Sequence, residues 1–439
     1  MNFFKLLFIL PALSSMLMAA HFSRVNNNWL ALGCLLFPLI LFSKRTWAMR
    51  LFQFFLVAGV AIWLERALFL INLRQRLRLP WLRLGIIITA VAFFTLLSAL
   101  IFNKQKIRDL FKKGDPAAVI PAVSASLLTA GLLIFVQFKV KTPVMLLGDR
   151  FVPGLGWLEI LLLTLYAGWV AEKILDPAKT AQVRARIWLL FSVVFFGQLI
   201  LGIVGIEKLL MTGKLHLPIP AMIAAGPLFR GEGIFMIILF TSTVILVGPA
   251  WCSYLCYIGA LDNLAAKGKK RPEELPKWRH AARIAILVLV IATALLLRWS
   301  GVPGIAATMV GAVFGLAGVG IMAWFSRKKG ALVHCITYCP IGLAANIMGK
   351  INPFRLRISD TCNDCGACTI ACRYEALTKE DIKKRRAGFT CTLCGDCLTR
   401  CNDKSIHFRF AGLKPETARK LFLVMVIALH AVFLGVARI

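Results

Sequence analysis

The chain has 439 residues, of which 59% are hydrophobic, and its mean hydropathy is +0.77. This composition excludes an ordinary soluble globular protein. The formal net charge of +32 is carried mainly by short loops between apolar stretches, where lysine and arginine set membrane topology, so we expect a lipid bilayer and not nucleic acid as the partner.

Apolar stretches long enough to cross a bilayer as helices recur along the chain. Their pattern predicts about eleven transmembrane helices, at roughly 4–21, 29–43, 51–72, 84–102, 117–137, 156–174, 187–206, 233–250, 281–299, 304–325 and 416–437. The end of the first stretch, Met18-Ala19-Ala20, also resembles a signal-peptide cleavage region, but the single preceding charge, Lys5, favours an uncleaved helix. The expected fold class is an all-α polytopic membrane protein.

Four isolated side chains in or near these stretches are candidates for a site within the membrane. Cys34 stands alone in the short second stretch and is expected to pack as a small apolar residue. Three histidines, His21, His216 and His430, fall towards the outer side in the predicted topology, where two of them could ligate haem b. Interfacial histidines are the interpretation that we favour, so haem b is not expected.

Two C-x3-C elements follow the eighth and tenth predicted spans, and they form an internal repeat. The first contains Cys252 and Cys256, and the second contains Cys335 and Cys339. Aligning Cys256 with Cys339 also aligns these pairs: Ile258 with Ile341, Gly259 with Gly342, and Asn263 with Asn346. Cysteines four residues apart share a helix face, so the two pairs could supply four thiolates to a third redox site at the inner membrane boundary. The alternative is that these cysteines pack as small apolar residues.

Eight further cysteines lie between the last two predicted spans, in two runs of the same spacing, C-x2-C-x2-C-x3-C. This pattern is typical of a bacterial-type ferredoxin with two [4Fe–4S] clusters, in which the fourth cysteine of each run completes the other cluster. Cluster one is therefore assigned Cys362, Cys365, Cys368 and Cys401, and cluster two is assigned Cys391, Cys394, Cys397 and Cys372. Zinc, the alternative metal, does not account for eight cysteines in two ferredoxin registers.

Other residues of the two cysteine runs shape the loops. Gly366 and Gly395 lie within them, where the missing Cβ is expected to let backbone N–H groups approach the cluster sulfurs. The residue after the fourth cysteine is often proline in this motif, but here it is Arg373 in one run and Asn402 in the other. Because that proline is not a ligand, we expect altered potentials rather than lost clusters.

These features divide the chain into four parts: a membrane domain of about seven helices (1–206), a membrane domain with the C-x3-C repeat (207–354), an inserted α+β ferredoxin domain (355–410) and a final transmembrane helix (411–439). Iron–sulfur thiolates favour a reducing compartment, so we expect a multi-pass protein of the bacterial cytoplasmic (inner) membrane with a cytoplasmic ferredoxin domain. Most basic loops then lie inside. The arginine-rich loop 73–83 would then lie outside, against that rule, so either a span is miscounted there or the segment binds an acidic partner.

The C-x3-C elements, the second followed by Pro340-x-Gly342, together with the two-cluster ferredoxin motif, resemble the membrane polyferredoxin family over about 233–410. That family includes the quinol-dehydrogenase ferredoxin subunit of periplasmic nitrate reduction, the regulator of nitrous oxide reductase expression and the accessory protein of cbb3-type oxidase assembly. The family motif is C-x3-C-P in both copies, whereas Tyr257 replaces the first proline here. The resemblance implies a quinol-linked redox chain, a quinone ligand, partner redox subunits and an extracytoplasmic acceptor.

The predicted function is electron transfer by a membrane-bound iron–sulfur protein, between a cytoplasmic or quinone donor and a membrane or extracytoplasmic redox partner. The chain would then be an electron-transfer subunit of a quinol-linked oxidoreductase. One alternative is a redox maturation factor for another metalloenzyme, which would use the same clusters with low steady turnover. A redox-sensing transporter is a second alternative, although the first seven spans contain few charges that could line a path.

Overall fold

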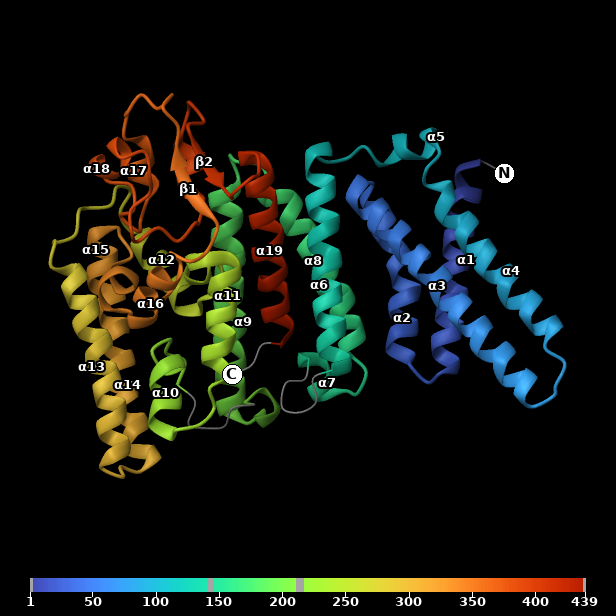
Figure 1. Cartoon of the computed structure of the whole chain (residues 1–439), viewed down its shortest axis with the longest axis horizontal. Helices are drawn as coiled ribbons and strands as arrows, with labels where there is room; N and C mark the ends of the chain where they lie inside the picture. The colour runs from blue at the N-terminus through green and yellow to red at the C-terminus, as the bar shows by residue number, and fades with distance from the viewer. Residues whose placement is uncertain (1–2, 140–145, 211–216, 437–439) are drawn as a thin grey trace. The chain divides into compact units, whose positions relative to one another are not determined.

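The structure is a computed structural model that describes residues 3–139, 146–210 and 217–436. The chain divides into two compact units, Met1–Glu172 and Lys173–Ile439. Helices dominate both units, and the strands found among the described residues form one two-stranded sheet (Figure 1). This confirms the coarse prediction of a mainly helical chain.

The first unit is a bundle of apolar helices. Its helices are α1 (Phe3–Arg24), α2 (Asn28–Leu36), α3 (Thr46–Arg76), α4 (Leu82–Ile101), α5 (Gln105–Arg108), α6 (Val119–Lys139), α7 (Leu147–Phe151) and α8 (Gly156–Ile174), which runs into the second unit. Helix α3 packs along α4, and α1 packs against α2. Inside this bundle the Ser14 hydroxyl donates to the Ser98 hydroxyl over 2.9 Å, which satisfies two polar groups that water cannot reach.

The second unit carries all the cysteines except Cys34. Its longer helices are α9 (Thr180–Val204), α10 (Met222–Arg230), α11 (Phe235–Val247), α12 (Tyr257–Ala266), α13 (Arg279–Trp299), α14 (Gly304–Ile321), α16 (Pro340–Met348) and α19 (Pro415–Val436). Two π-helical turns, Trp251–Leu255 and His334–Tyr338, precede α12 and α16. A third π-helical turn, Met322–Ser326, joins α14 to the short α15 (Arg327–Lys329).

Eight helical segments of the described chain are long and apolar enough to cross a membrane: Thr46–Arg76, Leu82–Ile101, Pro116–Lys139, Thr180–Val204, Phe235–Leu255, Arg279–Trp299, Gly304–Lys329 and Pro415–Val436. They correspond to eight of the predicted spans. The other three predicted spans fall on α1, on the shorter apolar segment Asn28–Ser43 and on α8. Helices α13 and α14 leave most of their apolar side chains exposed, as expected for surfaces that face lipid.

The cysteine-rich insert lies between α16 and α19. Its strands β1 (Arg355–Ile358) and β2 (Ile406–Arg409) pair antiparallel, with Arg355 opposite Arg409 and Ile358 opposite Ile406. Between them lie α17 (Ala367–Ala371), α18 (Lys379–Lys383) and a 3₁₀ helix at Asp396–Arg400. Figure 1 shows these elements gathered at one end of the helices of this unit.

The root of α19 fixes the sheet to the helices below it. Phe422 of α19 stacks against Phe408 of β2 with ring centroids 4.8 Å apart, and it meets Phe354, just before β1, at 5.4 Å. All three rings are almost fully buried. Aromatic burial of this kind contributes beyond the area removed from water, so both strands of the insert are held at the start of the last helix.

Candidate iron–sulfur site

Each C-x3-C element adopts the same local structure, although it is not the one expected. The first cysteine lies in a π-helical turn, whereas the second has an extended backbone, with φ and ψ of −86° and 113° at Cys256 and −74° and 115° at Cys339. The helix therefore breaks inside the element. The expectation that both cysteines share one continuous helix face is wrong, because the second cysteine begins a new helix.

The second cysteine of each element caps the helix that follows it. The Sγ of Cys256 accepts from the N–H of Gly259 over 3.4 Å, and the Sγ of Cys339 accepts from the N–H of Gly342 over the same distance. A sulfur at a helix N-terminus is surrounded by N–H groups and by the positive end of the helix dipole, which favours its thiolate form. The aligned glycines of the repeat therefore have a structural role in both copies.

The two elements meet around one cavity. Cys252, Cys256, Cys335 and Cys339 all line it. We call this cavity the boundary site; its wall is completed by residues of the helices and of the insert, among them Trp251, Arg283, Asn346, Tyr374, Thr390 and Thr392. Its empty volume is about 380 Å³. Four sulfur ligands that converge from two repeated hairpins match the donor set of a tetrahedral metal or of a cubane cluster.

The ferredoxin runs also repeat their backbone conformation. Six residues with left-handed φ form three pairs at equivalent places in the two runs: Asp364 with Leu393, Gly366 with Gly395, and Glu375 with Lys404. At Gly366 an added Cβ would meet no atom within 4 Å, so lack of space does not explain the glycine. Its φ of +71°, which other residues rarely adopt, does. The two loops therefore fold as copies of one another.

The cysteines of the insert are brought together in the crossed arrangement that the spacing predicts. Cys372, from the first run, lines a second cavity with Cys391, Cys394 and Cys397. We call this cavity the inner insert site; its empty volume is about 330 Å³, close to that of the boundary site.

The remaining four cysteines of the insert form a second group. Cys368 has Cys362, Cys401 and Cys365 as its electrostatic neighbours. We call this group the outer insert site, because Cys365 is exposed.

Burial controls the ionisation of these cysteines. Desolvation raises the pKa of Cys391 to about 11 and that of Cys394 to about 12, and it raises the pKa of Cys372 further. Desolvation likewise lies behind the raised pKa of Cys335 and Cys339. Thiols in such places stay protonated unless a cation takes their charge. Buried sulfur donors that converge in sets of four therefore fit iron bound as [4Fe–4S] clusters.

A buried carboxylate and an imidazole lie behind the boundary site. The backbone N–H of Cys335 donates to Oδ2 of Asp262 over 3.0 Å, and the ligand atoms of Asp262, His334 and Cys335 all lie within 4.8 Å of one another. Burial raises the pKa of Asp262 to about 6 and lowers that of His334 to about 4. Because Asp262 belongs to α12, this contact joins the second cysteine element to the helix that follows the first.

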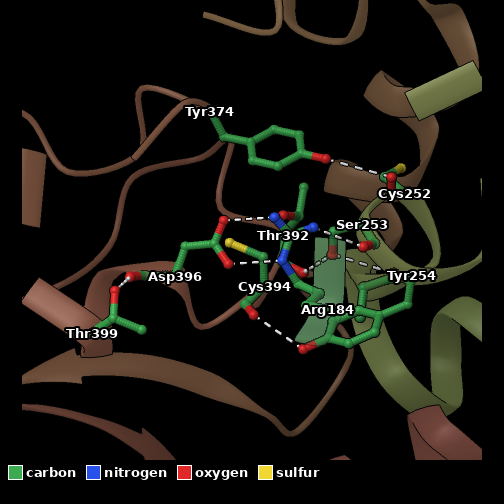
Figure 2. Close-up of polar contacts among 10 residues, drawn as sticks. Arg184, Cys252, Ser253, Tyr254, Tyr374, Thr392, Cys394, Asp396 and Thr399 are labelled. Atoms are coloured by element: carbon green, nitrogen blue, oxygen red, sulfur yellow. Dashed lines mark hydrogen bonds and ion pairs between the residues drawn. The ribbon is translucent and has the colours of Figure 1, made fainter. Parts of the chain in front are cut away.

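The insert is attached to the first C-x3-C element by a network of hydrogen bonds (Figure 2). The Tyr254 hydroxyl donates to the carbonyl of Cys394 over 3.0 Å, and the Ser253 hydroxyl donates to the carbonyl of Thr392 over 3.2 Å. In the opposite direction, the Tyr374 hydroxyl donates to the carbonyl of Cys252 over 3.4 Å. Three consecutive residues of one π-helical turn thus contact the loops that form the inner insert site.

Two residues belong to the walls of both cavities. Tyr374 and Thr392 line the boundary site and also the inner insert site. Both are almost fully buried, at 5% and 3% exposure. The two cavities therefore share part of one wall.

A buried ion pair fixes the same junction from the side of α9. The Nε and Nη2 atoms of Arg184 donate to the two carboxylate oxygens of Asp396 over 2.7 and 2.6 Å, while Nη1 donates to the carbonyl of Ser253 over 3.0 Å (Figure 2). From its position beside Arg186 at the start of an apolar stretch, Arg184 would be expected to be one of the basic loop charges. The structure corrects this, because only 1% of Arg184 is exposed.

Arg373 explains one departure from the usual ferredoxin motif. Its guanidinium donates to the carbonyls of Ala266, Gly330 and Lys269, which lie at the end of α12 and in the loops that follow α12 and α15. The N–H of Leu332 in turn donates to the Arg373 carbonyl over 3.0 Å. The position that holds a proline in many ferredoxins therefore carries a docking residue here.

Cys34 and His21 take no part in these sites. Cys34 is buried with Met18, Ala19 and Ala31 in the first unit, as expected of a packing residue. His21 lies against the rings of Phe22 and Trp63. His216 falls outside the described residues.

His430 belongs to α19 in the second unit. It is fully buried and donates from Nδ1 to the carbonyl of Tyr254 over 3.1 Å. It therefore lies beside the first π-helical turn, next to the junction with the insert.

Several residues that build the site have little or no sequence signal. Arg283 had a weak one, because it lies within a predicted membrane span, where a charge is costly unless it has a task. Asp262 lies next to Asn263, one of the aligned residues of the repeat. Tyr374, Arg184 and Asp396 had no sequence signal, because each contacts residues that are distant in the chain and that only the fold brings close.

Comparison with known proteins agrees with this geometry. Residues 230–273 match a family described as a 4Fe–4S binding domain, and this segment contains Cys252 and Cys256. No curated protein and no solved structure matches the chain. The match supports an iron–sulfur protein, and the eight long apolar helices indicate that it is associated with a lipid bilayer.

Replacement of Gly259 by alanine tests the local structure of the repeat. A Cβ at this position would lie 2.6 Å from Trp188 and 2.8 Å from the carbonyl oxygen of Cys252. We expect Gly259→Ala to lower the free energy of unfolding by about 1–3 kcal/mol, since the backbone must shift to relieve the overlap. Thermal unfolding of the detergent-solubilised protein measures this, together with its iron content.

The matched control is Gly320→Ala in α14, where an added Cβ meets nothing within 4 Å. It should keep or raise the unfolding free energy, by up to about 1 kcal/mol, because alanine is the better helix former and meets no neighbour. Equal effects of the two substitutions would contradict the proposed role of the glycine.

Removal of Asp396 tests the buried ion pair at the junction. Asp396→Ala leaves the Arg184 guanidinium buried without its charge partner, so we expect a loss of about 3–5 kcal/mol in unfolding free energy. The double variant Arg184→Met, Asp396→Leu should recover most of that loss. Glu416→Ala removes a far more exposed pair with Lys420 and should leave the unfolding free energy almost unchanged. If Asp396→Ala and Glu416→Ala unfold alike, the pair does not hold the junction.

Proposed function

We propose that this protein is a membrane-bound electron-transfer protein with three [4Fe–4S] clusters. Two are held by the insert, one at the outer site by Cys362, Cys365, Cys368 and Cys401, and one at the inner site by Cys391, Cys394, Cys397 and Cys372. The third is held at the boundary site by Cys252, Cys256, Cys335 and Cys339. When bound, each cluster accepts and releases one electron at a time.

The observation that carries the proposal is the common wall of two four-cysteine cavities. Tyr374 and Thr392 line both of them, and the volumes of the two cavities are similar. The exposed Cys365 at the outer insert site gives a soluble partner access to the opposite end of the series. The order outer insert site, inner insert site, boundary site therefore leads from the solvent to the ends of the apolar helices.

The family match supports the third site independently of cavity shape. The segment that matches a 4Fe–4S binding domain carries the first boundary pair, and it ends well before the ferredoxin runs of the insert. The first C-x3-C element thus lies in a segment like those that bind clusters elsewhere. The second element repeats its geometry, including the glycine N–H that donates to the cysteine sulfur.

The boundary site is the point where electrons pass to or from the membrane. The chain is oriented with its insert in the cytoplasm of a bacterial inner membrane, because cluster assembly needs a reducing compartment. The partner at the membrane side is a quinone or quinol, or a redox subunit whose own centre lies within electron-transfer range. The whole chain has the eleven spans that the sequence predicts, and the helices of the first unit dock such a subunit.

Removal of two boundary cysteines tests the number of clusters. We expect the wild-type protein, purified anaerobically, to contain about twelve iron atoms and three reducible centres by electron paramagnetic resonance, four irons for each cubane. The double variant Cys252→Ser, Cys335→Ser should lose about one third of the iron and one of the three signals. Cys34→Ser is the control and should lose neither. Unchanged iron in the double variant would reduce the boundary cysteines to packing residues.

Reaction with a quinone analogue tests the partner. We expect a water-soluble quinone to oxidise the reduced wild-type protein rapidly and in stoichiometric amounts. It should oxidise the Cys252→Ser, Cys335→Ser variant at least about tenfold more slowly, because electrons can no longer leave through the boundary site. Stopped-flow bleaching of cluster absorbance measures both rates. Failure of the wild-type protein to react would favour a role in the maturation of another metalloenzyme.

A further inference from the structure

A single buried guanidinium enters the boundary site from α13. Arg283 lies four residues from the start of that helix, is 2% exposed, and is part of the cavity wall. Its Nε and Nη1 atoms are buried without a hydrogen-bond partner. None of the ion pairs formed by the described residues includes Arg283.

The groups that face this guanidinium are sulfurs. Cys339, Cys252 and Cys335 are its electrostatic neighbours, and all three line the same cavity. Its Nη2 lies 3.3 Å from where a Cβ of Gly342 would be, so the missing side chain at that position leaves room for the charge beside the second cysteine element. Asp262, the nearby carboxylate, receives the N–H of Cys335 and does not pair with Arg283.

A guanidinium cannot relieve this situation by losing its proton, since its pKa is too high in any protein. A buried cation without a counter-ion is among the most destabilising features that a protein can contain. Four neutral thiols do not compensate it. A cluster or metal held by four thiolates does, because such a centre is a net anion, and the negative charge lies at the sulfurs that surround Arg283.

We propose that Arg283 is the counter-charge of the anionic centre at the boundary site and that it raises the reduction potential of that centre. The inference rests on the proposed third cluster. Reduction adds one electron to the centre, taken from the inner insert site or from an external one-electron donor, and no bond is formed or broken. The fixed positive charge stabilises the more negative, reduced form, as charge and hydrogen bonds around a cluster are known to do.

The inner insert site has a different electrostatic neighbourhood. The cation next to Cys394 is Arg184, and Asp396 neutralises it through the two short contacts of the buried pair. A second cation, Arg355, is an electrostatic neighbour of Cys391, and its guanidinium donates to the backbone carbonyls of Gly349 and Phe354. At the boundary site, by contrast, the Nε and Nη1 atoms of Arg283 have no hydrogen-bond partner. This difference gives the two sites, which share a wall, different preferences for the electron, and Arg283 directs the electron towards the membrane side.

Redox titration of full-length variants, followed by electron paramagnetic resonance, tests this role. In Arg283→Gln we expect the midpoint potential of the boundary signal to fall while the two signals of the insert keep theirs, which provides an internal control. Arg283→Lys keeps the charge and should stay closer to the wild type. Arg298→Gln removes the same charge from the far end of α13, where the residue contacts Leu228, and should leave all three potentials unchanged.

Each outcome decides the question. A boundary potential in Arg283→Gln equal to that of the wild type would overturn the proposal, and so would an equal shift in Arg283→Lys, which would point to shape instead of charge. Loss of the boundary signal in Arg283→Gln but not in Arg283→Lys would support the need for a counter-charge. Loss in both variants would count against it. Absence of the third signal from the wild type itself would instead end the proposed function.

Discussion

Charge that is buried away from water needs an opposite charge close by, and this constraint shapes the junction between the helices and the insert. Arg184 meets it through two short contacts to Asp396, a residue of the insert. Arg283 has no carboxylate partner among the described ion pairs, and the thiols of Cys339, Cys252 and Cys335 are its electrostatic neighbours. The thiols themselves are held protonated by desolvation until a metal takes their charge. The buried arginines and the proposed metal-bound thiolates would thus balance one another's charge, and the loops around them hold these groups close together.

The repeat is built by a change of direction at its second cysteine. A π-helical turn ends at Cys256 or Cys339, and a new helix starts with that sulfur as its cap. The turn leaves backbone carbonyls free, and the insert uses one of them, that of Cys252, through Tyr374. The irregular turn therefore positions a candidate cysteine ligand, begins the next helix and, in the first copy, provides a hydrogen-bond acceptor for the insert.

The sequence predicts much of this arrangement and misses a definable part. The spacing of the eight ferredoxin cysteines anticipates the gathering of Cys372 with Cys391, Cys394 and Cys397, and the repeat anticipates a common cavity for the boundary cysteines. Periodicity cannot show that the helix breaks between Cys252 and Cys256. Only in the second copy does a proline after the cysteine signal a helix start. Arg184 and Asp396 are 212 residues apart, and nothing local in either segment indicates the other.

The insert is continuous with the helices at both of its ends. Phe354, just before β1, and Phe408 of β2 are both packed on Phe422 at the root of α19. A carrier fastened in this way cannot leave and shuttle, so it meets its neighbour without a diffusional search. In the proposed function, electron transfer between the insert and the helical part is therefore unimolecular. Its rate should be the same in a crowded bilayer as in a dilute one.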